Sequence, residues 1–424
     1  MQLKRLAILF VHCSLFFTSA NAQTEITVFD EKTGQNEEID LPEGMMPAEL
    51  DSLLREWNTK NFIAIDESCQ STETNPVYDK EEYIRRLSRL PNVIDMPYNE
   101  VVRKFIDQYA DRLRRSVSIM LGASNFYFPL FEEALETYQM PLELRYLPVI
   151  ESALNPGATS RVGAAGLWQF MLVTGRQYGL EVTSLIDERR DPVKSSYAAA
   201  RYLKDLHDIF GDWTLAIAAY NCGPGNVSKA IKRAGGTGDY WSIYPYLPRE
   251  TRGYVPAFIA ANYVMTYYCD HGICPARTQL PSGTDTIMVS RDVRFEQVSE
   301  LCGVSLEELR ALNPQYRTSL VPGATRPLAI RMPSEAISQF IEAGDSIYAH
   351  RAEELFTKAE NEVAVDAAPT PRTSRSRGAR TVTVRPGDTL GAIARRNHTT
   401  VNAIKRLNGL RGSTIRPGKK LRVR

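Results

Sequence analysis

The feature that most constrains the fold of this chain is an internal repeat in its last third. When residues 289–323 are shifted by 95 positions, eight positions agree without a gap. The matched residues are apolar or turn-forming: Val289 with Val384, Phe295 with Leu390, Val298 with Ile393, Leu309 with Ile404, Leu312-Asn313 with Leu407-Asn408, and Pro322-Gly323 with Pro417-Gly418. A period that returns core and turn residues in the same order predicts two copies of one small unit. Each copy reads as a strand, two short helices and a strand (βααβ), which is a small α+β module.

The chain of 424 residues is long enough for several such units. Residues 362–380 lack core-forming periodicity and indicate a flexible linker. The expected order is a signal peptide at 1–22, an acidic N-terminal leader at 23–95, a mainly α domain at 96–280, a degenerate copy of the repeat at 284–332, a helical segment and flexible linker at 333–380, and the second copy at 381–424.

The net charge of +1 hides two oppositely charged parts. Residues 371–424 carry 15 Lys and Arg against one acid, Asp388, whereas residues 1–370 carry a net charge of −13. Residues 23–82 hold 16 acids and 4 bases, which predicts a weakly ordered leader without a catalytic role. A basic tail is typical of proteins that bind nucleic acid, but it suits anionic material of a cell envelope equally well.

An export signal decides between these two kinds of partner. Lys4 and Arg5 precede an apolar run from Leu6 to Phe17, and small residues end at Ala22. The run is too short to span a bilayer. We therefore expect cleavage after Ala22, a mature chain without a transmembrane span, no nucleic-acid partner, and a place in the periplasm or cell envelope, with outer-membrane association left open.

The mature chain keeps an odd number of cysteines, Cys69, Cys222, Cys269, Cys274 and Cys302, so at least one is free. Cys269 and Cys274 are close enough in sequence to form a short disulfide loop, and two free thiols are the equal alternative. The chain has no Cys-x-x-Cys or His-Glu-x-x-His motif, and its histidines are scattered. We expect neither a metal site nor a cofactor.

Apolar residues at three- and four-residue spacing predict helices between residues 99 and 268. The predicted segments are 101–115, 131–138, 142–152, 167–178, 193–210 and 213–219. Glu151 ends one apolar segment, where burial of its carboxyl would raise the pKa and keep a proton for general acid catalysis. The plain alternative is an exposed glutamate or one paired with an arginine.

Three further motifs accompany Glu151 and Ser152. They are Gly163-Ala-Ala-Gly-Leu-Trp-Gln169, Ala218-Ala-Tyr220-Asn221-Cys-Gly-Pro-Gly225, and Arg249-Glu250-Thr-Arg-Gly-Tyr254-Val255. In this order, over residues 125 to 268, they resemble the soluble-lytic-transglycosylase domain. The resemblance implies a mainly α, lysozyme-like catalytic domain that cleaves peptidoglycan glycan strands.

The same resemblance implies a role for each motif residue. Glu151 would protonate the glycosidic oxygen and later act as a base, with Ser152 beside it. The substrate-lining residues would be Gln169, Tyr220, Asn221, Glu250 and Tyr254. Cys222 and Leu172 depart from the family pattern, in which Ala and Pro are common, but neither change removes a polar catalytic group.

Residues 382–421 closely resemble a LysM domain, a module that binds peptidoglycan and chitin. By resemblance, the loop Gly387, Asp388, Thr389 and Leu390 forms part of a groove for N-acetylglucosamine units. In the first copy this loop reads Arg291-Asp-Val-Arg294, which predicts a retained fold with doubtful sugar affinity and a role as a spacer. Other cell-wall enzymes are candidate partners besides the glycan.

No second acid lies beside Glu151 in the motif, although glycosidases generally use two carboxylates. Asp187, Glu188 and Asp191 follow, but they read as a polar loop and helix start. A single acid favours attack by the muramyl 6-hydroxyl and a 1,6-anhydro product. A muramidase-type hydrolase and a non-catalytic peptidoglycan-binding protein are the alternatives. Trp168 and Phe170 are expected in the core, whereas Tyr240, Trp241, Tyr244 and Tyr246 fit a sugar-stacking wall or simple packing equally well.

Overall fold

The computed structural model describes residues 25–30, 34–42, 45, 63–65, 71–236, 238–278, 281, 283–357, 381–385, 388–397, 399–408, 410, 416 and 418–423. They fall into two compact units, residues 1–365 and 366–424. The predicted signal peptide lies outside the described residues, as does the whole of the predicted linker at 362–380. No helix in the described part of the chain is both long and apolar enough to cross a membrane.

The described part of the larger unit begins with an antiparallel hairpin of β1 (Glu25–Asp30) and β2 (Gln35–Asp40). Ile26, Val28 and Ile39 are buried, and β2 packs on a later helix, α12 (Arg249–Thr266). Arg249 pairs with Glu25 and Asp40, and Arg252 pairs with Glu37. The prediction of weak order is therefore wrong for this stretch of the acidic leader, because its carboxylates face arginines of α12.

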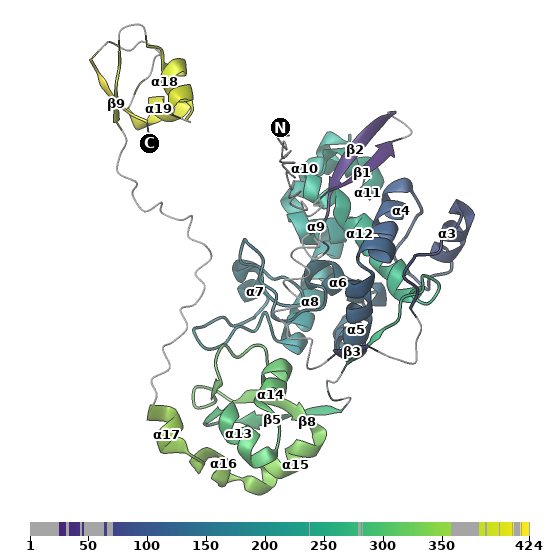
Figure 1. The fold of residues 1–424 in the computed structure, drawn as a ribbon, viewed down its shortest axis with the longest axis vertical. Helices are drawn as coiled ribbons and strands as arrows, with labels where there is room; N and C mark the ends of the chain where they lie inside the picture. The colour runs from purple at the N-terminus through teal and green to yellow at the C-terminus, as the bar shows by residue number, and fades with distance from the viewer. Residues whose placement is uncertain are drawn as a thin grey trace, which may run out of the picture. The chain divides into compact units, whose positions relative to one another are not determined.

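The body of the unit is helical, as predicted, and Figure 1 shows these helices gathered around α6, α8 and α12. Its α-helices are α3 (Lys80–Leu87), α4 (Glu100–Asp107), α5 (Arg114–Thr137), α6 (Leu147–Ser152), α7 (Leu172–Gln177), α8 (Pro192–Phe210), α9 (Trp213–Cys222), α10 (Pro224–Arg233), α11 (Tyr240–Ile243) and α12. Shorter turns of helix run over Gln108–Arg112, Leu142–Tyr146 and Tyr244–Tyr246, and β3 (Ile63–Ile65) pairs with β4 (Ala276–Thr278).

One continuous apolar core joins the hairpin and these helices. Trp168 and Phe170 lie in it, as expected, at 0% and 2% exposure. Side-chain caps fix several helix starts, since Asp191 accepts hydrogen bonds from the amides of Val193 and Lys194 at α8 and Asp212 accepts one from Leu215 at α9. The core holds α6, α9 and α12 against one another.

The first copy of the repeat has its own core in the same unit. It consists of β5 (Thr284–Val289), β6 (Asp292–Arg294), α13 (Phe295–Cys302), α14 (Leu306–Leu312), β7 (Leu320–Pro322) and β8 (Leu328–Pro333). The strands pair as β5 with β8 and β6 with β7. Helices α15 (Ser334–Ala343) and α16 (Asp345–Ala349) add Phe340 and Ile347 to this core, and α17 (Ala352–Thr357) follows.

The second copy forms the smaller unit, with β9 (Thr381–Thr383), α18 (Leu390–Arg396), α19 (Val401–Leu407) and β10 (Lys420–Arg422). An asparagine at the equivalent position of each copy confirms the repeat at atomic detail. Asn313 Nδ2 donates to the carbonyls of Leu309 and Arg331, and Asn408 Nδ2 donates in the same way to those of Ile404 and Arg422. The strand-helix-helix-strand prediction is confirmed for both copies.

The cysteines match neither of the two predicted arrangements. Cys269 is an exposed free thiol, and Cys222 and Cys302 are also free. Cys274 is disulfide-bonded. The Cys269–Cys274 disulfide is therefore wrong, and so is the alternative of two free thiols at these positions.

Candidate active site

Glu151 sits in the last turn of α6, the short helix predicted to present it. Leu147, Val149 and Ile150 of the same helix are buried, whereas Glu151 is half-buried. The helix ends at once because Ala153 and Leu154 adopt the left-handed conformation, with φ of 50° and 61°. Such backbone is uncommon for residues other than glycine and gathers at functional sites. The carboxylate is thus held at a sharp helix end.

Two tyrosines, the buried Tyr254 and the half-buried Tyr220, lie near this carboxylate. The Tyr254 hydroxyl of α12 donates a hydrogen bond to Glu151 Oε1. Burial, and after it the charge of Glu151, raises the pKa of Tyr254 well above its usual value, and the same two causes act on Tyr220 of α9. Both phenols therefore remain neutral hydrogen-bond donors at physiological pH.

Ser152 lies beneath the site, fully buried. Its hydroxyl is within hydrogen-bonding distance of the carbonyls of Pro148, at 3.0 Å, and Leu167, at 2.9 Å. Tyr220 makes a parallel contact, since its hydroxyl donates to the carbonyl of Trp168 at 2.7 Å. These bonds tie α6 and α9 to the segment that carries Gln169, so Ser152 is a link between elements.

Gln169 stands at the end of a tight turn. Ala165 and Phe170 exchange two backbone hydrogen bonds of 3.1 Å and close the turn. Gly166 and Gln169 both have positive φ, +84° and 47°, and the Gln169 side-chain amide donates to the Gly166 carbonyl at 2.7 Å. A Cβ at Gly166 would lie 1.8 Å from the carbonyl oxygen of Arg189, so only glycine fits there.

Asn221 and Glu250 lie at adjoining helix ends. The Thr251 hydroxyl donates to Asn221 Oδ1 at 2.9 Å, which joins the end of α9 to the start of α12. Glu250 is exposed in the first turn of α12 and precedes Tyr254 by four residues, so both lie on one face of that helix. The predicted site residues of the three motifs therefore converge on α6, α9, α12 and the 165–170 turn.

The acids that follow in the chain are held elsewhere, as predicted. Asp191 caps α8. Glu188 pairs with Lys194 and Arg326, and Asp187 pairs with Arg189 and Arg317. None of these three carboxylates is presented to the Glu151 site by the contacts described here.

The aromatic segment after α10 is mostly packing. Tyr240 is fully buried and donates to the carbonyl of Arg252 at 2.9 Å, and Tyr244 is 8% exposed. Trp241 is half-buried and stacks on Tyr244, whereas Tyr246 is 43% exposed. Of the four, Trp241 and Tyr246 keep surface that a ligand can reach.

Three family models match this chain. "Transglycosylase SLT domain" matches residues 129–242, which include Glu151, Gln169 and the Tyr220-Asn221 pair. "Lytic transglycosylase MltD, LysM-like domain" matches residues 283–349, and "LysM domain" matches residues 382–424. The order of the three matches is the order of motifs found in the sequence.

Similarity to a curated protein extends over most of the chain. Membrane-bound lytic murein transglycosylase D of Escherichia coli K12 is 32% identical over 332 residues, which are 77% of this chain and 70% of that protein. The chain belongs to the lytic murein transglycosylase D family. Its mainly α domain is a lysozyme-like transglycosylase domain, and LysM modules follow it.

Other members of the wider group match shorter stretches. The soluble lytic murein transglycosylase of Escherichia coli K12 is 32% identical over 124 residues, 28% of this chain and 19% of that protein. The crystal structure of the 70 kDa soluble lytic transglycosylase from Escherichia coli aligns with 34% of this chain and 24% of that chain, at 29% identity and a TM-score of 0.31.

The predicted sugar-binding loop of the LysM domain is partly described. Gly387 lies outside the described residues. Asp388 accepts a hydrogen bond from the Arg385 amide at 2.9 Å and pairs with Arg396, and Thr389 Oγ1 accepts one from the Ala392 amide. Leu390 is 3% exposed and belongs to the module core. The side chains of this loop thus fix its shape, and that of Leu390 supports the fold.

Some residues that organise the transglycosylase site were not singled out by its motifs. Arg189 donates to the carbonyls of Gly163, at 2.8 Å, and Phe170, at 3.1 Å, and so holds the base of the Gln169 turn. Thr251 orients Asn221. The dense charge pattern from Asp187 to Asp191 was the only sequence signal for Arg189, because its partners are backbone carbonyls.

Proposed function

We propose that Glu151 is the general acid and base of a lytic transglycosylase reaction on the MurNAc-GlcNAc β-1,4 bond of peptidoglycan. The observation that carries the proposal is the half-buried Glu151 carboxylate at the left-handed end of α6, hydrogen-bonded by the buried Tyr254. A fixed donor holds the carboxyl in one rotamer, and proton transfer depends on that geometry. Membership of the transglycosylase D family supports the same role.

In the proposed reaction, Glu151 gives its proton to the glycosidic oxygen as the C1–O bond breaks. The N-acetyl group of the sugar stabilises the positive charge that develops at C1, as in substrate-assisted glycosidases. The muramyl 6-hydroxyl then attacks C1 and returns its proton to the Glu151 carboxylate. The product is a 1,6-anhydromuramyl end, and no water is consumed.

Intramolecular attack has a proximity advantage over water, because the reacting groups belong to one sugar. Gln169, Tyr220, Asn221 and Tyr254 would hold that sugar in the reactive conformation. In this assignment, Ser152 acts by fixing α6 to the Gln169 turn. Glu250, exposed on the same face of α12 as Tyr254, would bind a sugar hydroxyl or amide.

A muramidase-type hydrolysis is the alternative that a specific residue could support. If Glu250 acted as a base towards water, the reaction would yield reducing ends. Purified sacculi digested in ¹⁸O water separate the two outcomes by mass. Unlabelled anhydro ends support the proposal, and labelled reducing ends as the main primary product reject it. Glu250→Gln should retain anhydro product. Labelled reducing ends that disappear in that variant would favour the hydrolase.

We also propose the cellular setting. Export by the segment 1–22 would place the enzyme in the periplasm or cell envelope. Association with the outer membrane would fit the word membrane-bound in the name of the Escherichia coli relative. The LysM domain at 381–424 would keep the catalytic domain near glycan strands. The proposed boundaries of the catalytic domain are 96–280, and those of the first LysM-like module are 284–332. Other cell-wall enzymes would be partners in the same layer, and fractionation of a full-length fusion tests the location.

A further inference from the structure

The first LysM-like module, residues 283–349, packs against one loop of the transglycosylase domain. Ile186 of that loop belongs to the module's own apolar core and forms an isolated β-bridge with Tyr316. The Asp187 amide donates to the Gln315 carbonyl at 2.8 Å, and the Arg317 amide donates to the Leu185 carbonyl at 2.9 Å. The loop from 185 to 187 is thus shared between the two domains.

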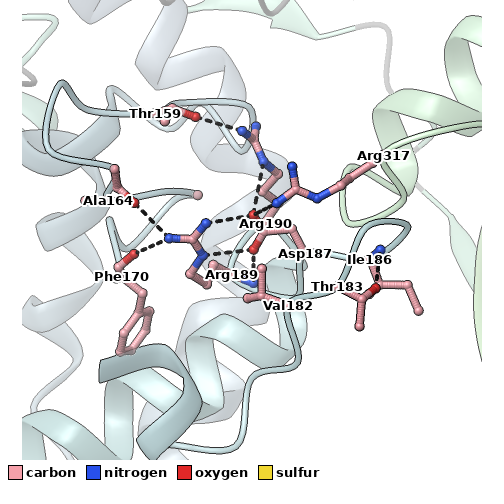
Figure 2. Close-up of polar contacts among 12 residues, drawn as sticks. Thr159, Ala164, Phe170, Val182, Thr183, Ile186, Asp187, Arg189, Arg190 and Arg317 are labelled. Carbon is pink, nitrogen blue, oxygen red and sulfur yellow. Dashed lines mark hydrogen bonds and ion pairs between the residues drawn. The ribbon is translucent and has the colours of Figure 1, made fainter. Parts of the chain in front are cut away.

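Asp187 is the ionic centre of this contact and is 1% exposed. Arg189 of the catalytic domain binds both of its oxygens, at 2.9 and 2.8 Å, and Arg317 of the module binds Oδ2 at 3.0 Å. Figure 2 shows Arg189 and Arg317 reaching the carboxylate from opposite domains. Paired charges this deeply buried depend on one another's position.

Arg189 also links Asp187 to the Gln169 turn. Its guanidinium also donates to the carbonyls of Gly163 and Phe170, which lie on either side of the turn. Figure 2 shows the bond to Phe170. The carbonyl oxygen of Arg189 would lie 1.8 Å from a Cβ at Gly166. An unbroken series of bonds therefore runs from Arg317 through Asp187 and Arg189 to the turn that carries Gln169.

The loop of this module that corresponds to the predicted groove loop of the second copy contacts helices that follow it in the chain. Arg291, in the loop that corresponds to the groove loop of the second copy, pairs with Asp345 at 2.7 Å and lies 4.1 Å above the Tyr348 ring. Arg294 lies over the Phe356 ring of α17. Helices α16 and α17 thus contact the two arginines of this loop.

We infer that Arg317 of the first LysM-like module is a positioning residue for the transglycosylase site, acting through Asp187 and Arg189 on the turn that carries Gln169. The module is then a brace for the substrate-lining turn and more than the spacer predicted from its sequence. The inference rests on the proposed function, since the placement of Gln169 matters only if this site binds the glycan.

The test compares two arginines of the module that both pair across the same contact. Arg317→Met keeps the length of the side chain and removes its charge, and Arg317→Lys keeps both. Arg326→Met is the matched control, because Arg326 pairs with Glu181 and Glu188 and has no described bond to Asp187 or Arg189. Turnover of a soluble peptide-free GlcNAc-MurNAc tetrasaccharide is measured with the full chain, together with the thermal midpoint of each variant.

We expect Arg317→Met to lower kcat about tenfold, since displacement of a positioning group by about 1 Å costs up to about a hundredfold. Arg317→Lys should restore kcat to within about threefold and Arg326→Met should stay within about twofold, as expected for sites without shared partners. Equal kcat losses in Arg317→Met and Arg326→Met, or no difference between the Met and Lys variants at position 317, would overturn the inference.

A second background separates positioning from simple loss of folded enzyme. In Gln169→Ala, the residue through which Arg317 acts is already gone, so Arg317→Met should lower kcat by less than about twofold further. The same tenfold loss in both backgrounds would contradict the inference. Product analysis of the unsubstituted chain is independent: reducing ends in place of anhydro ends reject the proposed function, whereas the ratio between variants tests Arg317.

Discussion

The Tyr254 hydroxyl donates a hydrogen bond to the carboxylate of Glu151, which lies 103 positions earlier in the sequence. The bond joins α12 to the end of α6, and Tyr220 from α9 lies close enough for the Glu151 charge to raise its pKa. Three helices thus present one carboxylate and two neutral phenols to the same place.

Replacing the carboxylate tests the acid directly. Glu151→Gln is nearly isosteric and still accepts a hydrogen bond from Tyr254, so the fold should persist. General acid and base help is worth roughly 10² to 10⁴ in rate, and one group serves both steps here, so the loss should reach about 10⁴. Release of soluble muropeptides from sacculi measures it. Residual turnover of more than a few per cent would remove Glu151 from the role.

Tyr254→Phe removes only the hydroxyl that Glu151 accepts. We expect kcat to fall about tenfold, because the carboxyl loses its fixed donor while the ring still fills the core. The control is Tyr263→Phe, a buried tyrosine on the same helix whose hydroxyl contacts Arg86 and His271 instead. Equal activity losses in the two variants would point to a general weakening of α12.

The pH dependence follows from the direction of the Tyr254 shift. A raised phenol pKa means that the neutral form persists to higher pH, so Tyr254 should still donate at pH 10. The phenolate absorbance difference between the unsubstituted chain and Tyr254→Phe should therefore be flat up to pH 10. A phenolate signal assignable to Tyr254 below that pH would contradict the buried hydrogen bond.

The sequence predicted the helices that carry a regular apolar stripe and missed those that do not. Residues 193–210 and 213–219 became α8 and α9 almost as predicted. In α12 nearly every residue is buried, so its sequence has no amphipathic pattern. Gly253 and Pro256, which are unfavourable inside helices, further weaken the helix signal. The predicted helix at 167–178 holds only at 172–177, because Gln169 adopts positive φ in a turn closed by tertiary bonds.

The site itself was predictable to the extent that its residues form local motifs. Glu151, Tyr220 and Tyr254 were named from motifs, and the structure brings them together. The bonds of Ser152 to the Leu167 carbonyl and of Arg189 to the Phe170 carbonyl could not be foreseen. A carbonyl carries no side-chain identity, so such contacts leave no pattern in a single sequence.

Gly166→Ala should damage both stability and turnover. Its φ of +84° disfavours any side chain by about 1–2 kcal/mol, and its Cβ would meet the Arg189 carbonyl at 1.8 Å. Gly211→Ala is the matched control, because Gly211 has φ of +68° with nothing within 4 Å of a Cβ. The control should lose only about 1 kcal/mol in urea unfolding, and Gly166→Ala clearly more. Similar losses of stability in the two variants would mean that the backbone at Arg189 moves to make room for the Cβ.

His271 should make the fold acid-sensitive. It is fully buried, its Nδ1 lies 2.6 Å from Asn75 Oδ1, and burial, with Arg86 nearby, lowers its pKa from 6.5 to about 4. Because the unfolded chain takes up this proton near pH 6.5 and the folded chain only near 4, stability should fall as pH drops through this window. The loss amounts to about 3 kcal/mol at most. His271→Gln should show a smaller decrease in thermal midpoint between pH 7 and 4.5, and an equal decrease would exclude His271 as the cause.

Removing residues 371–424 should separate wall binding from chemistry. These residues carry a net charge of +14, include the whole LysM match, and belong to a unit distinct from the catalytic domain. Tethering raises the local concentration of insoluble substrate and changes nothing at Glu151. Sacculus binding and digestion should therefore fall about tenfold or more, while kcat on a soluble tetrasaccharide stays within about twofold. The control is replacement of the linker residues 366–376 by a Gly-Ser segment of equal length, which should leave both activities unchanged. Equal losses on the two substrates after the deletion would show that the tail supports the catalytic domain directly.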